Sequence, residues 1–285
     1  DVCSSDLLSF GISGIHGYPV KVEVFSVGGL PGMDIIGLPD ASVRESRERV
    51  NAAILTSGKD MPPRRITVNL APADIRKEGP SFDLPIAVGL LIANGQLCIR
   101  EDFNLERTVI FGELSLDGRI RPVRGALAMV ISASELGLTD VILPSDNAME
   151  VACIQGMNIF PVSDLTQVIN HLEGAAYIEP QRQIKYEELR QNWNAAVDLS
   201  QVKGQQGARR ALEVAAAGGH NMLMIGAPGS GKTMLARCLP GILPPMSFSE
   251  SLETTRIFSI AGKLNHSLIN RLGVLLLNSV LTVRE

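Results

Sequence analysis

The chain has 285 residues, of which 45% are hydrophobic and 20% charged, with a formal net charge of −4. This length is enough for about two domains, and the charge excludes a global electrostatic footprint for nucleic acid. No stretch reaches the roughly 18 consecutive apolar residues of a membrane span. A signal-peptide pattern is also missing, so we expect a cytoplasmic protein with no membrane partner.

The first part of the chain alternates segments with the period of a strand and segments with the period of a helix. Expected strands are 20–24, 66–70, 108–111, 141–143 and 159–160, with an Asp-Gly hairpin turn within 116–120. Expected helices are 40–57 with Asp40 as N-cap, 84–94, 126–136, 147–155 and 165–172. This mixture predicts a mixed α/β or α+β domain over residues 1–174.

Residues 175–197 are polar and rich in Gln, Glu and Arg, which is typical of an interdomain linker. A partly helical stretch is expected there around 186–189. A second unit is expected over 198–285, with helices at 205–217 and 249–260. The chain begins without Met and ends soon after the motif described next, so we expect a fragment of a longer protein.

Residues 226–233 carry the full G-x-x-x-x-G-K-[ST] pattern of a phosphate-binding loop. An apolar run of strand length precedes them, and a helix-compatible run follows. The candidate ligand-binding residues are Gly226, Ala227, Pro228, Gly229, Ser230, Gly231, Lys232 and Thr233. Lys232 is expected to reach the β- and γ-phosphates, and the Thr233 hydroxyl to ligate Mg²⁺. The pattern predicts binding of a nucleoside triphosphate.

The chain closely resembles the magnesium-chelatase-like AAA+ proteins of the YifB/ComM group. The matching segments are 37–40, 43–46, 69–74, 77–79, 82–87, 112–114, 202–205, the phosphate loop and 239–245. The resemblance implies a Lon-protease-like domain (ribosomal S5 domain 2-like fold) followed by a truncated P-loop NTPase (AAA+) domain. It implies ATP and Mg²⁺ as ligands, a homo-oligomeric ring in the full-length protein, and DNA as a candidate partner. By the same similarity, residues 201–204 would line the base pocket.

Nucleotide hydrolysis also requires carboxylates at the end of a following strand. The apolar run 272–277 is followed instead by Asn278 and Ser279. Two explanations compete: a degraded site, or an unrelated tail produced by truncation or a frame error after Asn265. We favour the second, because the resemblance stops at His266. Under either explanation we expect the isolated chain to bind ATP weakly and to turn it over negligibly, which leaves its classification as an enzyme open.

The Lon-like segment contains Ser81, but the position that matches the catalytic lysine of Lon is Met129. A thioether cannot accept the proton of a serine, so we interpret Ser81 as a small residue in a tight loop. The N-terminal half is locally basic through Arg44, Arg47, Arg49, Arg64, Arg65, Arg76 and Lys77. Interleaved glutamates favour a solvated helix face over a nucleic-acid patch.

The leading hypothesis is an ATP-binding protein that, at full length, is an ATP-driven ring acting on DNA. One alternative is a non-enzymatic assembly module that nucleotide orders. A second alternative, the ATPase subunit of magnesium chelatase, is disfavoured because the Lon-like half belongs to the YifB/ComM architecture.

Overall fold

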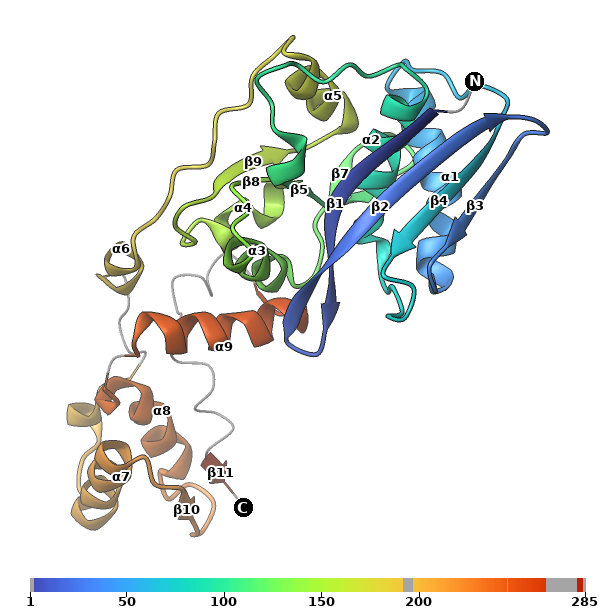
Figure 1. Ribbon diagram of the computed structural model, residues 1–285. Helices are drawn as coiled ribbons and strands as arrows, with labels where there is room; N and C mark the ends of the chain where they lie inside the picture. The colour runs from blue at the N-terminus through green and yellow to red at the C-terminus, as the bar shows by residue number, and fades with distance from the viewer. Residues whose placement is uncertain (1–2, 192–196, 245, 265–280, 284–285) are drawn as a thin grey trace. The chain divides into compact units, whose positions relative to one another are not determined.

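The computed structural model describes residues 3–191, 197–244, 246–264 and 281–283 (Figure 1). They divide into two compact units. Unit 1 comprises the residues up to Gln183 together with Phe258–Lys263, and unit 2 comprises Ile184–Ile257 and the described residues after Lys263. No helix within these ranges has both the length and the apolar character needed to cross a membrane.

The described part of unit 1 is built on a seven-stranded sheet with the order β3-β4-β2-β1-β5-β8-β9. Its strands are β1 (Cys3–Ser13), β2 (His16–Gly28), β3 (Gly32–Ile36), β4 (Arg64–Ala71), β5 (Thr108–Ile110), β8 (Asp140–Pro144) and β9 (Asn158–Val162). The β1–β2 and β2–β4 pairs are antiparallel, and the other four pairs are parallel. The expected mixture of helices with a sheet is confirmed, and the sheet is mostly parallel.

A separate hairpin joins β6 (Glu113–Leu114) to β7 (Ile120–Arg121). Its turn contains the expected Asp-Gly pair, and Gly118 there has a φ of 81°. The first strand of the hairpin ends at Leu114, just before the segment 116–120 that was expected to contain the turn. The sequence did not predict β1 or β3.

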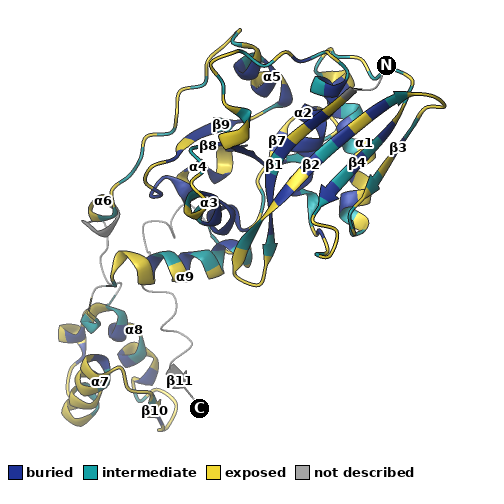
Figure 2. Cartoon of the chain, viewed as in Figure 1, coloured by how far each residue is buried: buried dark blue, intermediate teal, exposed yellow. Residues whose placement is uncertain are grey.

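The helices of unit 1 lie close to their expected positions. They are α1 (Ala41–Thr56), α2 (Asp83–Ala93), α3 (Ala126–Glu135), α4 (Ser145–Val151) and α5 (Leu165–Glu173), with short 3-10 turns at Pro80–Phe82 and Leu105–Arg107. Asp40 caps α1 as predicted, because its carboxylate accepts a hydrogen bond of 2.8 Å from Val43 N. Helix α4 ends earlier than expected, in a turn closed by Ile154 N on Val151 O. Figure 2 shows α2 almost wholly buried.

Unit 2 contains α6 (Tyr186–Gln191), a 3-10 turn (Leu199–Gln201), α7 (Gln206–Gly218), β10 (Met222–Met224), α8 (Lys232–Ile242), most of α9 (Phe248–Ile260) and β11 (Leu281–Val283). Strand β11 pairs in parallel with β10. A small apolar core that includes Leu212, Leu235 and Leu239 joins α7 to α8. The apolar run 272–277 and the two polar residues after it lie outside the described residues.

Candidate phosphate-binding site

The loop between β10 and α8, together with the first two residues of α8, carries every candidate ligand-binding residue. Strand β10 ends at Met224 and α8 begins at Lys232, which is the strand–loop–helix order that the motif predicts. Residues 226–229, Gly231 and Thr233 are exposed. The loop is therefore accessible to a ligand along most of its length.

Two glycines give the loop its path. Gly229 and Gly231 have φ values of 79° and 88°, in the left-handed region that residues with a Cβ rarely adopt. A Cβ built on either glycine would meet no atom within 4 Å. The requirement for glycine is thus a matter of backbone torsion, and the space beside both residues is open to a ligand.

Lys232 closes the loop on itself. Its Nζ donates hydrogen bonds of 2.8 Å to the carbonyl of Gly226 and 3.0 Å to the carbonyl of Ala227. The residue is only 9% exposed. An ammonium group has three donors, so these bonds leave one for an anion. A phosphate oxygen is a stronger acceptor than a neutral carbonyl, and it can therefore compete for the engaged donors.

The start of α8 offers further donors. Its first backbone bond runs from Leu235 N to Gly231 O at 3.0 Å, and no side chain caps the helix. The N–H groups of Lys232, Thr233 and Met234 lie before that bond and point along the positive end of the helix dipole. This arrangement fits a phosphate group. The exposed Thr233 hydroxyl at the same end fits a role as a Mg²⁺ ligand.

The segment expected to line the base pocket runs up to the loop. Val202 is buried in the core of unit 2, whereas Gln201, Lys203 and Gly204 are exposed. The next residue, Gln205, donates from Nε2 to the carbonyl of Ser230 at 3.4 Å. Segment 201–204 is thereby connected to the phosphate loop.

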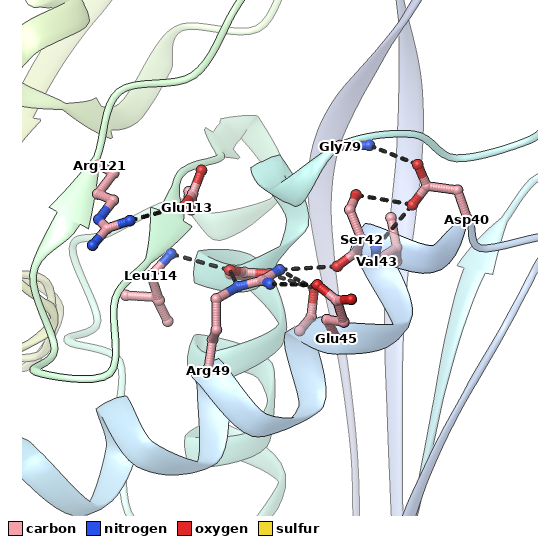
Figure 3. Close-up of polar contacts among 11 residues, drawn as sticks. Asp40, Ser42, Val43, Glu45, Arg49, Gly79, Glu113, Leu114 and Arg121 are labelled. Atoms are coloured by element: carbon pink, nitrogen blue, oxygen red, sulfur yellow. Dashed lines mark hydrogen bonds and ion pairs between the residues drawn. The ribbon is translucent and has the colours of Figure 1, made fainter.

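A second polar cluster surrounds Asp83, the first residue of α2. Figure 3 labels Arg49 and Leu114, which both donate to the Asp83 carboxylate. Arg49 donates to its carboxylate from Nε at 2.6 Å and from Nη2 at 3.0 Å. Ser46 Oγ and Leu114 N, the latter at 3.1 Å, also donate to it. Burial raises the pKa of Asp83, and the hydrogen bonds from Arg49 and Ser46 oppose that rise. The cluster anchors α1, α2 and β6 to one another.

Ser81 lies in the 3-10 turn just before this cluster. The residue is 9% exposed, and its carbonyl accepts a hydrogen bond of 2.9 Å from Gly112 N. Met129 is buried in α3, where it packs beside Gly17 of β2: a Cβ on Gly17 would lie 2.9 Å from Met129 Cα. A buried thioether supplies no base for acyl transfer.

Five of the seven basic residues singled out in the sequence are paired with carboxylates or buried, whereas Arg44 is exposed. Arg47 pairs with Glu48, Arg49 with Asp83, Arg65 with Asp34, and Arg76 with Glu78. Lys77 is fully buried and donates to the carbonyls of Pro72 and Ile75. Paired and buried cations of this kind do not form a continuous surface for nucleic acid. Within the described ranges, no group of three or more His, Cys, Asp or Glu residues could hold a metal ion.

Sequence reasoning missed three contacts that the fold brings together. They are the Asp83–Arg49 pair, the bond from Ser259 to Glu150, and the bond from Gln205 to Ser230. Their partners are separated by 34, 109 and 25 positions in the chain. Asp83 lay in a matching segment, Arg49 was among the basic residues that the sequence singled out, and Gln205 and Ser230 lay in two further segments, but no sequence signal joined the partners of any pair.

Two family models match the chain. The model described as "Subunit ChlI of Mg-chelatase" matches residues 22–147, and the model described as "Magnesium chelatase, subunit ChlI" matches residues 198–273. The first range lies within unit 1, and the second contains the whole phosphate loop.

Similar proteins match most of the chain. The chain is 44% identical over 252 residues to the uncharacterized protein YifB of Salmonella typhimurium and 38% identical over 248 residues to the competence protein ComM of Haemophilus influenzae. Each match covers 87% of this chain and 48% of the relative, so the chain spans about half the length of these curated relatives. It is also 25% identical over 181 residues to the Lon protease of Mycolicibacterium smegmatis, covering 59% of this chain and 22% of the protease.

Proposed function

Because the chain belongs to the magnesium-chelatase-like family that includes YifB and ComM, we propose that it binds ATP and Mg²⁺ through the phosphate loop. The observation that carries this proposal is the position of Lys232. Its ammonium group is held inside a glycine loop at the uncapped start of α8. A fixed cation beside helix N–H groups matches the triphosphate of a nucleotide.

The chain's own residues divide the work of binding. Lys232 would exchange the carbonyls of Gly226 and Ala227 for β- and γ-phosphate oxygens. The N–H groups at the start of α8 would hold the phosphates, and Thr233 would offer its hydroxyl to Mg²⁺, which neutralises phosphate charge when bound. Segment 201–204 would line the base pocket, beside the loop that Gln205 contacts.

At the level of the whole protein we propose an ATP-driven, homo-oligomeric ring in the cytoplasm, with DNA as the partner it moves. The domain layout that fits this role is a Lon-like domain over 1–174, a linker over 175–197 and the first part of an AAA+ domain over 198–285. Support comes from the family and from the name of one relative, a competence protein. The paired basic residues of unit 1 add no support for DNA binding.

A second candidate is an assembly module without catalysis, in which nucleotide only orders the structure. The buried Met129 favours it, because a Lon-like unit without a lysine base keeps the fold and not the chemistry. Nucleotide-dependent oligomerisation without any binding of DNA would support this candidate. A role as the ATPase subunit of magnesium chelatase remains disfavoured, because the chain is also similar to a Lon protease over 59% of its length.

A fluorescent ATP analogue tests the proposal. We expect saturable binding in the presence of Mg²⁺, displacement by unlabelled ATP, and weaker binding after Thr233→Ala or after chelation of Mg²⁺. If neither Thr233→Ala nor chelation of Mg²⁺ changed the affinity, the assignment of Thr233 as a Mg²⁺ ligand would be contradicted.

A further inference from the structure

The backbone of Gln205 has an unusual conformation. Gln205 lies immediately before α7, with a φ of 51° and a ψ of 39°. Among the described residues other than glycine, only Leu38 also has a positive φ. The left-handed region is costly for a residue with a Cβ, and it persists where the surrounding structure imposes it. A backbone conformation of this kind is often associated with a functional role of the residue.

The side chain of Gln205 contacts the phosphate loop and not its own helix. It makes no capping bond to α7. Its Nε2 donates instead to the carbonyl of Ser230, 25 positions later in the chain. The preceding Gly204 has a φ of 72°, so two consecutive left-handed residues turn the chain at this point. The strained backbone thus directs the amide group to the loop.

This exposed contact of 3.4 Å favours one direction of a single peptide unit. The Ser230 carbonyl and the Gly231 N–H belong to the same planar, trans peptide and point in opposite directions. A donor on the Ser230 oxygen therefore turns the Gly231 N–H away from Gln205. Lys232 holds the carbonyls of Gly226 and Ala227 at the other end of the loop. The two side chains together restrain the loop at both ends.

We propose that Gln205 is a positioning residue that orients the Ser230–Gly231 peptide for the triphosphate. This inference rests on the proposed function, since it assigns a further residue to the same site. Gln205 sets the loop before nucleotide arrives, which reduces the ordering cost of binding. Gln205 also directly follows segment 201–204, which is proposed to line the pocket for the nucleotide base. It therefore links that segment to the loop proposed to bind the phosphates.

Substitution by glycine separates a positioning role from a structural one. Gln205→Gly relieves the left-handed strain and deletes the amide, so stability and affinity should change in opposite directions. We expect the thermal midpoint to stay level or rise by a few degrees and Mg-ATP affinity to fall by about fivefold. Gln205→Asn tolerates the same torsions with a shorter side chain and should lose affinity similarly. The matched control Gln206→Gly changes an exposed neighbouring glutamine and should keep affinity within twofold.

Affinity of Gln205→Gly within twofold of the original chain would overturn the proposal, and so would a parallel fall in affinity and thermal midpoint. The Gly231 amide in ligand-free protein gives a readout that needs no nucleotide. Its ¹H–¹⁵N signal should shift or broaden in Gln205→Gly and stay unchanged in Gln206→Gly; an unchanged signal in both would overturn the proposal. Absence of ATP binding by the original chain would instead contradict the proposed function, while the amide signal still tests the role of Gln205.

Discussion

The Nζ of Lys232 lies 2.8 Å from the carbonyl oxygen of Gly226, six residues earlier in the chain. The ammonium group therefore bonds back to the first residues of the loop, because its Nζ also donates to the carbonyl oxygen of Ala227 at 3.0 Å. A nucleotide must replace these two neutral acceptors with phosphate oxygens. A phosphate oxygen carries a negative charge that the carbonyls lack, so Coulombic attraction to the ammonium group is added to the hydrogen bond and the exchange favours the bound state.

Gly231→Ala should weaken both the loop and the binding of ATP. The φ of 88° costs alanine about 1 kcal/mol of folding free energy. The added methyl group also enters the open space beside the loop, and we expect affinity to fall by about tenfold, or roughly 1.4 kcal/mol. Chemical denaturation measures the first effect, and titration with Mg-ATP the second.

Gly207→Ala is the matched control for that substitution. Gly207 lies in α7, where an added Cβ meets no atom within 4 Å and no positive φ is required. Alanine is the better helix former, so stability should rise by about 0.5–1 kcal/mol with affinity unchanged. If Gly231→Ala and Gly207→Ala lost affinity for Mg-ATP equally, the role given to Gly231 would be wrong.

Turnover of ATP by this chain should be negligible. The loop can bind a nucleotide, but hydrolysis also requires a carboxylate at the end of a following strand, and the apolar run 272–277 is followed by Asn278 and Ser279. Phosphate release by the purified chain should equal that of Lys232→Ala. Steady hydrolysis that Lys232→Ala abolishes would contradict this prediction.

Removing Arg49 should strongly destabilise unit 1. Asp83 is fully buried, and Arg49 supplies two of its hydrogen bonds. Arg49→Met leaves the carboxylate without its cation, at a cost of about 3 kcal/mol. The control Arg47→Met lies on the same helix, where Arg47 is 56% exposed and pairs only with its neighbour Glu48. That variant should change the free energy of unfolding by about 0.5 kcal/mol or less; similar losses in both would contradict the role given to the pair.

The buried carboxylate of Glu150 predicts a pH dependence of stability. Burial raises its pKa above the usual 4.5, although bonds from Ser259, Asn147 and Leu127 oppose the rise. The thiol of Cys153, whose pKa is raised to about 11 by burial and by Glu150, stays neutral below pH 8. The folded state thus holds the Glu150 proton more tightly than the unfolded state does. The contribution of Glu150 to stability is therefore fully present below pH 4.5, the ordinary pKa of its carboxyl group. It is lost as pH rises through the raised pKa of the folded state.

Glu150→Gln removes this titration. Its free energy of unfolding, relative to that of the original chain, should therefore rise between pH 4.5 and pH 7.5, which means that the variant becomes relatively more stable. The new amide group also brings an N–H donor among the groups that donate to Glu150, which lowers the free energy of unfolding by the same amount at every pH. The dependence of the difference on pH is therefore unaffected. Denaturant midpoints at four pH values measure it, and parallel profiles for the two proteins would show that the Glu150 pKa is not raised.

Much of the fold could be predicted from local patterns. Helix α1 carried its own cap in Asp40, and β4 alternated buried Ile66, Val68 and Leu70. Strand β1 escaped prediction because several of its positions are serines, including the fully buried Ser9. Its place between β2 and β5 is set by non-local pairing. Strand β3 is short and begins at a glycine, which weakens any strand signal.

In the candidate site, too, the features that depend on a local motif could be predicted, and the contacts between distant residues could not. The glycine torsions and the start of α8 follow from a contiguous motif, so the sequence predicts both. The bond between Gln205 and Ser230 depends on how α7 packs on α8, and the cluster at Asp83 joins three elements. No local period encodes such contacts, because each partner alone has an ordinary polar side chain.

The central claim is that the loop at 226–233 binds the triphosphate of ATP, and titration calorimetry with Mg-ATP tests it most directly. The account predicts saturable heat with one site per chain, and a loss of at least tenfold in affinity for Lys232→Ala in a protein that unfolds at the same temperature. No saturable heat from the folded original chain, or equal affinity in both proteins, would contradict it.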